Sequence, residues 1–421
     1  VACGGAVLFC CFCDPHTHLV KAHTVPRNRN PTGSITDALR CELDDQPRWA
    51  AREGDVARRM DFALQCAWHH GTRALRTHLD GTAAPEPTTR AAVYAAFDAA
   101  RRAWAPRGLE LQGVANLYLP LYLQQEAAEA HAAEAAGHPG VALGAYCGDV
   151  SAGEGTEEAE RALDALFALA ARHGLDVDLH IDETNNPLCC GTYLLCRSLG
   201  RARARGYAGR VVLGHACALT LSDKKEDAIA LLGALGPVAV VCNPLTNLGL
   251  QDRRGTARPH GLDIAAHEPR TPLWRGLAPV QELAAAGVTV AAASDNVRDW
   301  WHAYGDLDAL HIWRAALQLG HLDTAPHEGA WARLVAGAAA EAMGMEALAV
   351  RPGDPADLVL FPGARRASEL LARPQPDRIV LRGGRVQFSR LPDYRELDDL
   401  VAAATPREPR GLVLRGATEA G

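Results

Sequence analysis

A (β/α)8 barrel, the TIM-barrel fold, is predicted by three features of this 421-residue chain. Short apolar runs rich in Val, Leu and Ala recur between Ala6 and Ala293. Segments with helical spacing lie between these runs, as in alternating β and α units. Polar side chains that can bind a metal follow several of the runs, and the active site of such a barrel is built at the C-terminal ends of its strands.

Eight strands and six helices are expected in this region. The strands are Ala6–Cys13, Thr72–Thr77, Leu109–Leu117, Val141–Tyr146, Val177–Ile181, Arg210–Leu213, Val238–Cys242 and Val288–Ala293. The helices are Thr89–Trp104, Leu123–Ala136, Thr156–His173, Asn186–Arg205, Asp223–Ala234 and Leu277–Ala286. The barrel is expected over residues 6–343, a small β-sandwich part with any remaining N-terminal strand over 344–390, and a surface or disordered tail over 391–421.

The polar residues that follow the expected strands suit a metal site. They are His16 and His18 after the first run, His78 and Asp80 after the second, His180 and Glu183 after the fifth, His215 after the sixth, and Asp295 and Asn296 after the eighth. His16 and His18 are two residues apart, so in a strand both imidazoles point to one face and can bind one ion. Although far apart in sequence, all these residues are expected at one mouth of the barrel.

Composition excludes several classes of function. The net charge is −7 and the pI is near 6.2, which argues against binding to nucleic acid or to an anionic membrane. The apolar runs are too short to span a membrane, and no signal peptide is visible. Most of the twelve cysteines lie in apolar runs, as in a reduced cytoplasmic protein. Cys10 and Cys13 form one Cys-x-x-Cys without a second pair, so no closed zinc site is expected.

Five motifs in order resemble the amidohydrolase superfamily, and within it the cytosine deaminase-like branch. They are Asp14-Pro15-His16-Thr17-His18-Leu19, Arg76-Thr77-His78-Leu79-Asp80, His180-Ile181-Asp182-Glu183, Cys242-Asn243-Pro244-Leu245 and Ser294-Asp295-Asn296-Val297-Arg298-Asp299-Trp300-Trp301. Gly353–Val359 and Arg382–Val386 resemble the β-sandwich that this superfamily attaches to its barrel. Relatives begin with a further segment of that sandwich, whereas this chain starts one strand before the first motif. Val20 stands where relatives usually carry Asp.

The resemblance implies a mononuclear catalytic site. Its ligands would be His16, His18, His180 and Asp295, which hold one Zn2+ or Fe2+ per chain and leave room for a water. Two-metal relatives use a lysine at the end of strand four, where this chain has Ala145-Tyr146-Cys147-Gly148. Glu183 is expected to shuttle protons, with His215 and Asp295 assisting. His78 is expected to hydrogen-bond its neighbours rather than to bind the metal.

The expected reaction is hydrolytic deamination of a nitrogen heterocycle, most simply of cytosine to uracil and ammonia, by a hydroxide formed at the metal. Tyr118 stands where cytosine deaminase has a Gln that reads the ring, Asn296 resembles aminotriazine-acting relatives, and Trp301 is expected to pack on the ring. Other rings, namely an N-substituted aminotriazine, creatinine or isoguanine, stay open, as does an inactive binding barrel. The resemblance also implies a homo-oligomer.

The remaining histidines are assigned by position in the sequence. Six of them fall in expected helices or loops and are predicted to lie on the surface: His23, His69, His70, His131, His138 and His173. His260 and His267 lie in a long loop after the seventh strand, where a lid is expected.

Overall fold

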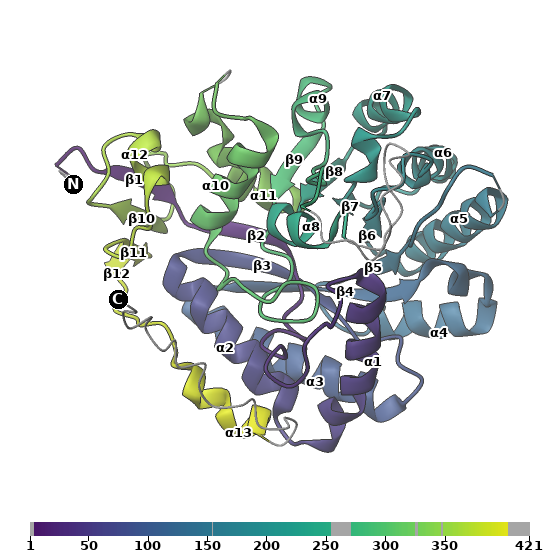
Figure 1. Cartoon of the computed structure of the whole chain (residues 1–421), viewed down its shortest axis with the longest axis horizontal. Coiled ribbons are helices and arrows are strands. Elements are labelled where there is room, and N and C mark those ends of the chain that lie inside the picture. The colour runs from purple at the N-terminus through teal and green to yellow at the C-terminus, as the bar shows by residue number, and fades with distance from the viewer. Residues whose placement is uncertain (1–3, 154, 254–270, 325–326, 347, 403–421) are drawn as a thin grey trace, which may run out of the picture.

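The computed structural model describes residues 4–153, 155–253, 271–324, 327–346 and 348–402. Eight parallel strands follow one another around a barrel in sequence order, with helices outside them, which confirms the predicted fold (Figure 1). The barrel strands are β2 (Phe12–Thr17), β3 (Thr72–Leu79), β4 (Glu110–Tyr118), β5 (Val141–Tyr146), β6 (Val177–Ile181), β7 (Val211–His215), β8 (Val238–Cys242) and β9 (Thr289–Ala292). A bridge between Thr17 and Asp295 joins the two ends of the sheet.

Thirteen α-helices are found in the described part of the chain. They are α1 (Ile35–Ala51), α2 (Asp55–His70), α3 (Pro87–Trp104), α4 (Gln125–Ala136), α5 (Thr156–His173), α6 (Gly191–Ala204), α7 (Lys225–Leu235), α8 (Pro244–Leu250), α9 (Val280–Ala285), α10 (Ala309–Gly320), α11 (Gly337–Ala342), α12 (Ala367–Ala372) and α13 (Asp398–Ala402). Short 3-10 helices occupy Ala105–Arg107, Leu119–Leu123, Ala218–Thr220, Glu328–Val335 and Tyr394–Leu397. All six expected helices are present, although α6 begins five residues later than expected.

The strands of the barrel read as continuous apolar runs because both of their faces are buried. Every residue of β8 is buried, and the same holds for β6 and β7. In a parallel barrel one face packs on the surrounding helices and the other fills the interior, so the alternating pattern of a half-exposed strand is absent. Short helical crossovers between strands then bring the C-terminal ends of all eight strands to one mouth.

The first expected strand, Ala6–Cys13, is wrong as a single barrel strand. Its first half is β1 (Val7–Cys10), which belongs to a separate small sheet, and the barrel begins with β2. The break falls at Cys11, whose backbone N–H donates to the carbonyl of Asp357 in the appendage. His16 therefore lies within a barrel strand rather than after it, so its side chain points into the barrel.

The small sheet is antiparallel, with the order β1, β10 (Leu358–Phe361), β11 (Ile379–Arg382) and β12 (Arg385–Val386). The N-terminal β1 pairs along its whole length with β10, so segments about 350 residues apart in sequence lie side by side (Figure 1). Phe361 and Val359 of β10 are fully buried and join the main core. The appendage is thereby packed against the barrel.

The tail was expected to be surface or disordered. Its described part forms a short helical segment, Tyr394–Ala402, whose side chains are mostly exposed, while Leu397 and Leu400 are buried with Phe62 and Cys66 of α2. Residues 403–421 lie outside the described residues.

The expectation for the histidines is wrong in part. Among the histidines placed on the surface, His23, His70 and His131 are buried. Their sequence positions are compatible with exposure, and only the packing of α2 and α4 against their neighbours encloses them. His260 and His267 lie outside the described residues.

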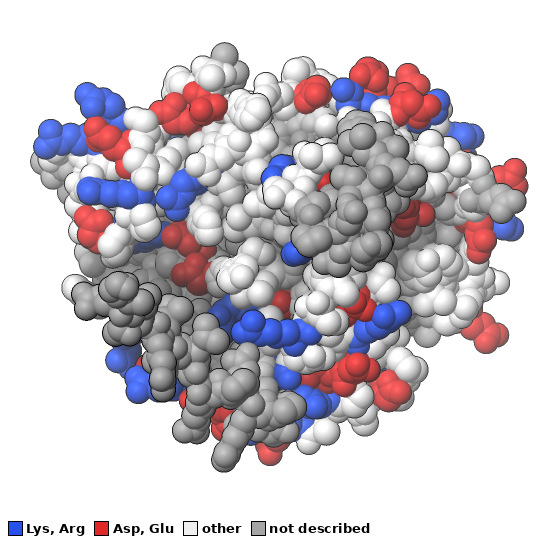
Figure 2. Space-filling view, viewed as in Figure 1, with Lys and Arg blue, Asp and Glu red and all other residues white. Residues whose placement is uncertain are grey.

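No helix among the described residues is long and apolar enough to cross a membrane. Figure 2 shows acidic and basic side chains interspersed over the described part of one face of the molecule. The described residues of that face therefore form no continuous patch of only positive or only negative charge.

Candidate metal-dependent active site

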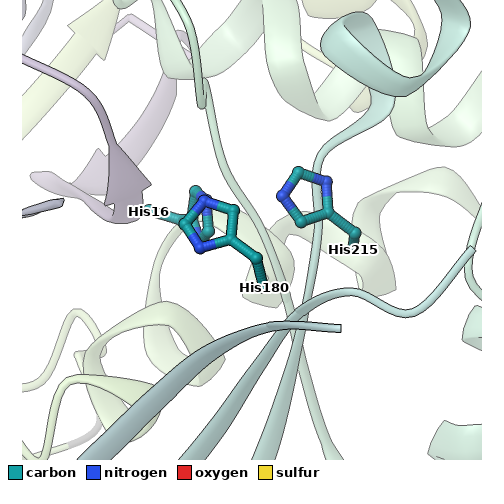
Figure 3. A group of neighbouring side chains, drawn as sticks. All are labelled: His16, His180 and His215. Carbon is teal, nitrogen blue, oxygen red and sulfur yellow. The ribbon is translucent and has the colours of Figure 1, made fainter. Parts of the chain in front are cut away.

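Three imidazoles from different strands point toward one another at the mouth of the barrel. His16 comes from β2, His180 from β6 and His215 from the end of β7 (Figure 3). The ring centroid of His16 lies 4.7 Å from that of His180 and 5.1 Å from that of His215. All three rings are buried, so this cluster is assembled inside the barrel rather than on its surface.

His18 and Asp295 complete the set of four expected ligands. Nε2 of His18 lies 3.1 Å from Nε2 of His180 and 3.3 Å from Oδ1 of Asp295. The same Oδ1 lies 3.6 Å from Nε2 of His16. Donors that share one Zn2+ at 2.0–2.1 Å lie roughly 3.0–3.5 Å apart, so the spacing of these atoms suits a common ion.

Unpaired polar atoms also indicate that these residues share one metal ion. Nε2 of His16 and both carboxylate oxygens of Asp295 are buried and have no hydrogen-bond partner among the described residues. Buried polar atoms are nearly always satisfied, so their convergence on one point calls for a ligand. The donor set of three imidazoles and one carboxylate fits a divalent ion such as Zn2+ or Fe2+.

The two histidines of the His-x-His pair are held by different partners. Nδ1 of His18 lies 2.9 Å from Asp80, whose carboxylate also accepts from Nζ of Lys21 at 3.2 Å. Nδ1 of His16 lies 3.0 Å from Nε2 of His78, in agreement with the expected hydrogen-bonding role of that residue. In both rings the second nitrogen is thus engaged and Nε2 is left for a metal.

Burial and neighbouring charges set the ionisation of the cluster. The pKa values of His16 and His180 lie well below their usual range because both rings are buried and surrounded by other imidazoles. Burial opposes the charge of His18, but the Asp80 carboxylate prevails and raises the pKa of His18 to about 9. A metal that binds His18 must displace a proton from it, so affinity for the ion should rise with pH.

Glu183 lies beside the cluster, just after β6. Its Oε1 is 3.6 Å from Nδ1 of His215, and burial raises the pKa of its carboxyl group. A carboxyl whose pKa is raised is protonated more readily, which suits a general acid and base. His215 is in turn held by Nδ2 of Asn247 at 3.1 Å from its Nδ1.

Three residues at the ends of the strands adopt left-handed backbone conformations. The φ angles are 52° at Asp182, 71° at His215 and 59° at Asp295. Such conformations are costly for residues other than glycine and gather at functional sites, where the surrounding packing enforces them. Here they turn the chain sharply at the strand ends so that His215 and Asp295 face the cluster.

A cavity of about 520 Å³ opens from this cluster, a size typical of sites for small molecules. Its floor includes His18, His180, Glu183, His215 and Asp295, and one wall is a face of α1 formed by Ile35, Leu39, Glu42, Leu43 and Gln46.

The three expected substrate contacts all line the cavity. Tyr118 is half-exposed, at the end of β4. The amide of Asn296 already donates to Asp299 at 2.9 Å. One face of the Trp301 ring is covered by Nζ of Lys21, which lies 3.6 Å from the ring centroid. Trp300 is buried in the core instead, with its indole N–H donating to the carbonyl of Asn28.

Sequence reasoning missed α1 and Lys21 as parts of the site. The spacing of Ile35, Leu39, Glu42, Leu43 and Gln46 is that of one helix face, and Ser34 caps the helix by accepting from the backbone N–H of Asp37. These signals were available, but Pro47 inside the helix obscured the pattern. Lys21 is buried and bonds to Glu42 at 3.4 Å, so the network that starts at His18 ends on α1.

The fold and the site together are those of a barrel enzyme with a candidate metal site at the C-terminal ends of its strands. The amidohydrolase family profile matches residues 136–388. The chain is 40% identical to a pterin deaminase of Rhizobium rhizogenes over 93% of this chain and 83% of the relative. This chain belongs to the amidohydrolase family, and it is a hydrolase that acts on carbon–nitrogen bonds in cyclic amidines.

Two solved structures share the fold. The 5-methylcytosine deaminase of Klebsiella pneumoniae superposes with a TM-score of 0.74 and 22% identity, over 92% of this chain and 87% of that one. The N-isopropylammelide isopropylaminohydrolase of Burkholderia multivorans superposes with a TM-score of 0.68 and 25% identity, over 91% of this chain and 87% of that one. The barrel with its appended small sheet is therefore an architecture that hosts several amine-releasing hydrolases.

Proposed function

We propose that this enzyme removes the exocyclic amino group of a pterin, an aminopteridine with two fused rings, and releases ammonia. The observation that carries the proposal is the cavity, which starts at the metal donors and Glu183 and continues to the apolar wall of α1. Its volume of about 520 Å³ has room for two fused rings. The 40% identity to a pterin deaminase supports the same substrate.

His16, His18, His180 and Asp295 would hold one divalent ion, Zn2+ or Fe2+. When bound, such an ion supplies Lewis-acid activation of a water, whose pKa falls from 15.7 toward about 7. Asp80 and His78 hold the two histidines of the His-x-His pair in orientation, since each engages the ring nitrogen that faces away from the cluster.

Glu183 moves the protons of the reaction in this proposal. Its carboxyl group, whose pKa is raised by burial, delivers a proton to the ring nitrogen next to the amino-bearing carbon. It takes up both protons of the attacking water in turn: one passes to the leaving amine, and the other replaces the proton given to the ring nitrogen, so that Glu183 ends as it began. Nδ1 of His215, 3.6 Å from Oε1 of Glu183 and 3.9 Å from Oδ2 of Asp295, lies between the two carboxylates, where the ring would orient the attacking water.

Trp301 and Tyr118 would confine the flat ring in the cavity. Because Lys21 covers one face of Trp301, the ring of the substrate can use only the other face or the edge of the indole. The apolar side chains of Leu39 and Leu43 on α1 are 43% and 53% exposed in the described residues, which leaves them free to contact the second ring.

A second candidate is removal of an alkylamino group from an aminotriazine. It is favoured by the 25% identity to N-isopropylammelide isopropylaminohydrolase and by Asn296, which lines the cavity next to Asp295. Cytosine, the simplest substrate expected from the sequence, stays in the comparison as a one-ring control.

The eleven described cysteines are free and buried, which supports a cytoplasmic enzyme.

The test is ammonia release by the Zn2+- or Fe2+-loaded protein from pterin, cytosine and N-isopropylammelide, with Glu183→Gln as the blank. Isopropylamine is measured in parallel for the triazine. We expect pterin to give the highest kcat/KM, and its turnover to be lost in the blank. Faster release from the triazine or from cytosine would reject the pterin proposal while keeping the site, and turnover that persists in the blank would reject the role of Glu183.

A further inference from the structure

A row of three side chains runs from the metal donors into the barrel. Nδ1 of His16 lies 3.0 Å from Nε2 of His78 in β3, and Nδ1 of His78 lies 3.0–3.3 Å from the amide of Asn116 in β4. His16 and His78 are fully buried. Each of the three comes from a different barrel strand, so the row is a product of the tertiary fold.

Two strand glycines make room for this row. A Cβ at Gly214 of β7 would lie 2.6 Å from Cε1 and 2.8 Å from Nδ1 of His16. A Cβ at Gly144 of β5 would lie 2.4 Å from Oδ1 of Asn116. Glycine weakens a strand interior and often marks a close approach of another group. At both ends of the row a side chain therefore packs directly against glycine backbone.

Which ring nitrogen carries the proton in His16 and His78 follows from the proposed role of His16 as a metal ligand. A nitrogen that binds a metal must carry a free lone pair, so the neutral ring of His16 has its proton on Nδ1. That N–H donates to Nε2 of His78, which must then be unprotonated. The proton of His78 is consequently on its Nδ1. Nδ2 of the Asn116 amide lies 3.0 Å and Oδ1 lies 3.3 Å from that nitrogen, so this tautomer selects the amide orientation that turns the oxygen toward His78, where it accepts the proton.

We propose that His78 is a positioning residue that accepts the hydrogen bond of His16 Nδ1 and thereby directs the unprotonated Nε2 of His16 at the metal, with Asn116 fixing the tautomer of His78. The inference rests on the proposed metal site and does not depend on the substrate. It gives the His-x-His pair one neutral partner, His78, and one anionic partner, Asp80. A neutral partner donates less negative charge to its ligand, so the ion stays a stronger Lewis acid than with two carboxylate partners.

A second metal ion between His16, His78 and Asp178 is the competing arrangement, since these three offer donor atoms close together. Nε2 of His78 lies 3.8 Å from Oδ1 of Asp178. Oδ2 of Asp178 is paired with Arg76 at 2.9 Å, whereas Oδ1, the oxygen that faces His78, has no hydrogen-bond partner among the described residues. Nε2 of His78 also cannot accept from His16 and bind an ion at once, which favours the hydrogen-bonded row.

The experiment measures the Zn2+ dissociation constant of the full chain by competition with a chelator of known affinity. We expect His78→Ala to weaken binding by about 10–100-fold, the usual cost of losing such a partner, and His78→Gln, whose side-chain oxygen can still accept from His16, to weaken it less. Added imidazole should restore affinity to His78→Ala. The matched control is His131→Ala, which removes another buried imidazole, bonded only to the carbonyl of Ala115, and should leave Zn2+ affinity unchanged.

Affinity of both His78 variants within twofold of the wild type would overturn the inference. So would two ions per wild-type chain with one lost in His78→Ala, because His78 would then be a ligand. If the His78 variants do not fold, the inference is tested by comparing the Zn2+ affinities of Asn116→Asp and Asn116→Leu. The first keeps an acceptor for His78 and should bind Zn2+ at least threefold more tightly than the second, and equal affinities would refute the tautomer argument. A wild-type chain that binds no Zn2+ or Fe2+ would instead reject the proposed site itself.

Discussion

Substitution of Glu183 by Gln should remove activity without removing stability. Glu183 is 8% exposed and its carboxyl pKa is raised chiefly by burial, so its negative charge is unfavourable in the folded chain. Gln keeps the shape and carries no charge. The free energy of unfolding of Glu183→Gln should therefore equal or exceed that of the wild type.

The catalytic loss follows from the position of the carboxyl group. Oε1 of Glu183 is 3.6 Å from His215 and borders the cavity beside the metal donors. Of the other described carboxylates that line the cavity, Asp295 is a proposed ligand, and Asp80 and Glu42 are paired with Lys21. Loss of a general acid and base typically costs about 10²–10⁴-fold in rate. This corresponds to about 2.7–5.5 kcal/mol in the activation free energy. KM should change little, because the amide still fills the same space.

The neighbouring Asp182 gives a control with the opposite outcome. Its carboxylate accepts from the backbone N–H and the hydroxyl of Thr192 at 3.1 and 2.5 Å, at the start of α6. Asp182→Ala should lower the free energy of unfolding by about 2–4 kcal/mol, while kcat per folded molecule stays within about tenfold. Ammonia release and urea unfolding of both variants test the pair. A Glu183→Gln rate within tenfold of the wild type, or a loss of stability equal to that of Asp182→Ala, would refute the reasoning.

Three other results are expected. Leu43→Asn should raise KM for pterin about three- to tenfold by removing apolar contact with the second ring, whereas Leu188→Asn, exposed outside the cavity, should not change it. Chelation should abolish turnover and lower the melting temperature, since an ion at 1,000 times its dissociation constant adds about 4 kcal/mol, and added Zn2+ or Fe2+ should restore both. Burial, with Arg298 and Arg59 nearby, lowers the pKa of His23 to about 3. Its contribution to stability is present above pH 6.5 and lost as pH falls, by about 2 kcal/mol at pH 5, and urea unfolding of His23→Gln should show a correspondingly flatter decline.

Much of the fold and of the candidate ligand set was accessible from the sequence. Strands such as Val141–Tyr146 and Val177–Ile181 were predicted with their observed bounds because a strand buried on both faces reads as a bounded apolar run. The gathering of His16, His180 and Asp295 followed from one topological rule, that parallel strands present their C-terminal ends at the same mouth. Such rules need only local pattern and strand order.

The tertiary structure decided what depends on contacts between distant segments. The break at Cys11 arises because β1 pairs with β10, a partner that the local sequence does not reveal. The burial of His23 and the contact of α1 with the cavity depend on how helices pack over the barrel. The same holds for His78, whose sequence position allows ligation or hydrogen bonding. Its 3.0 Å contact with Nδ1 of His16 joins residues 62 positions apart, and only the packing of β2 against β3 in the barrel interior selects it.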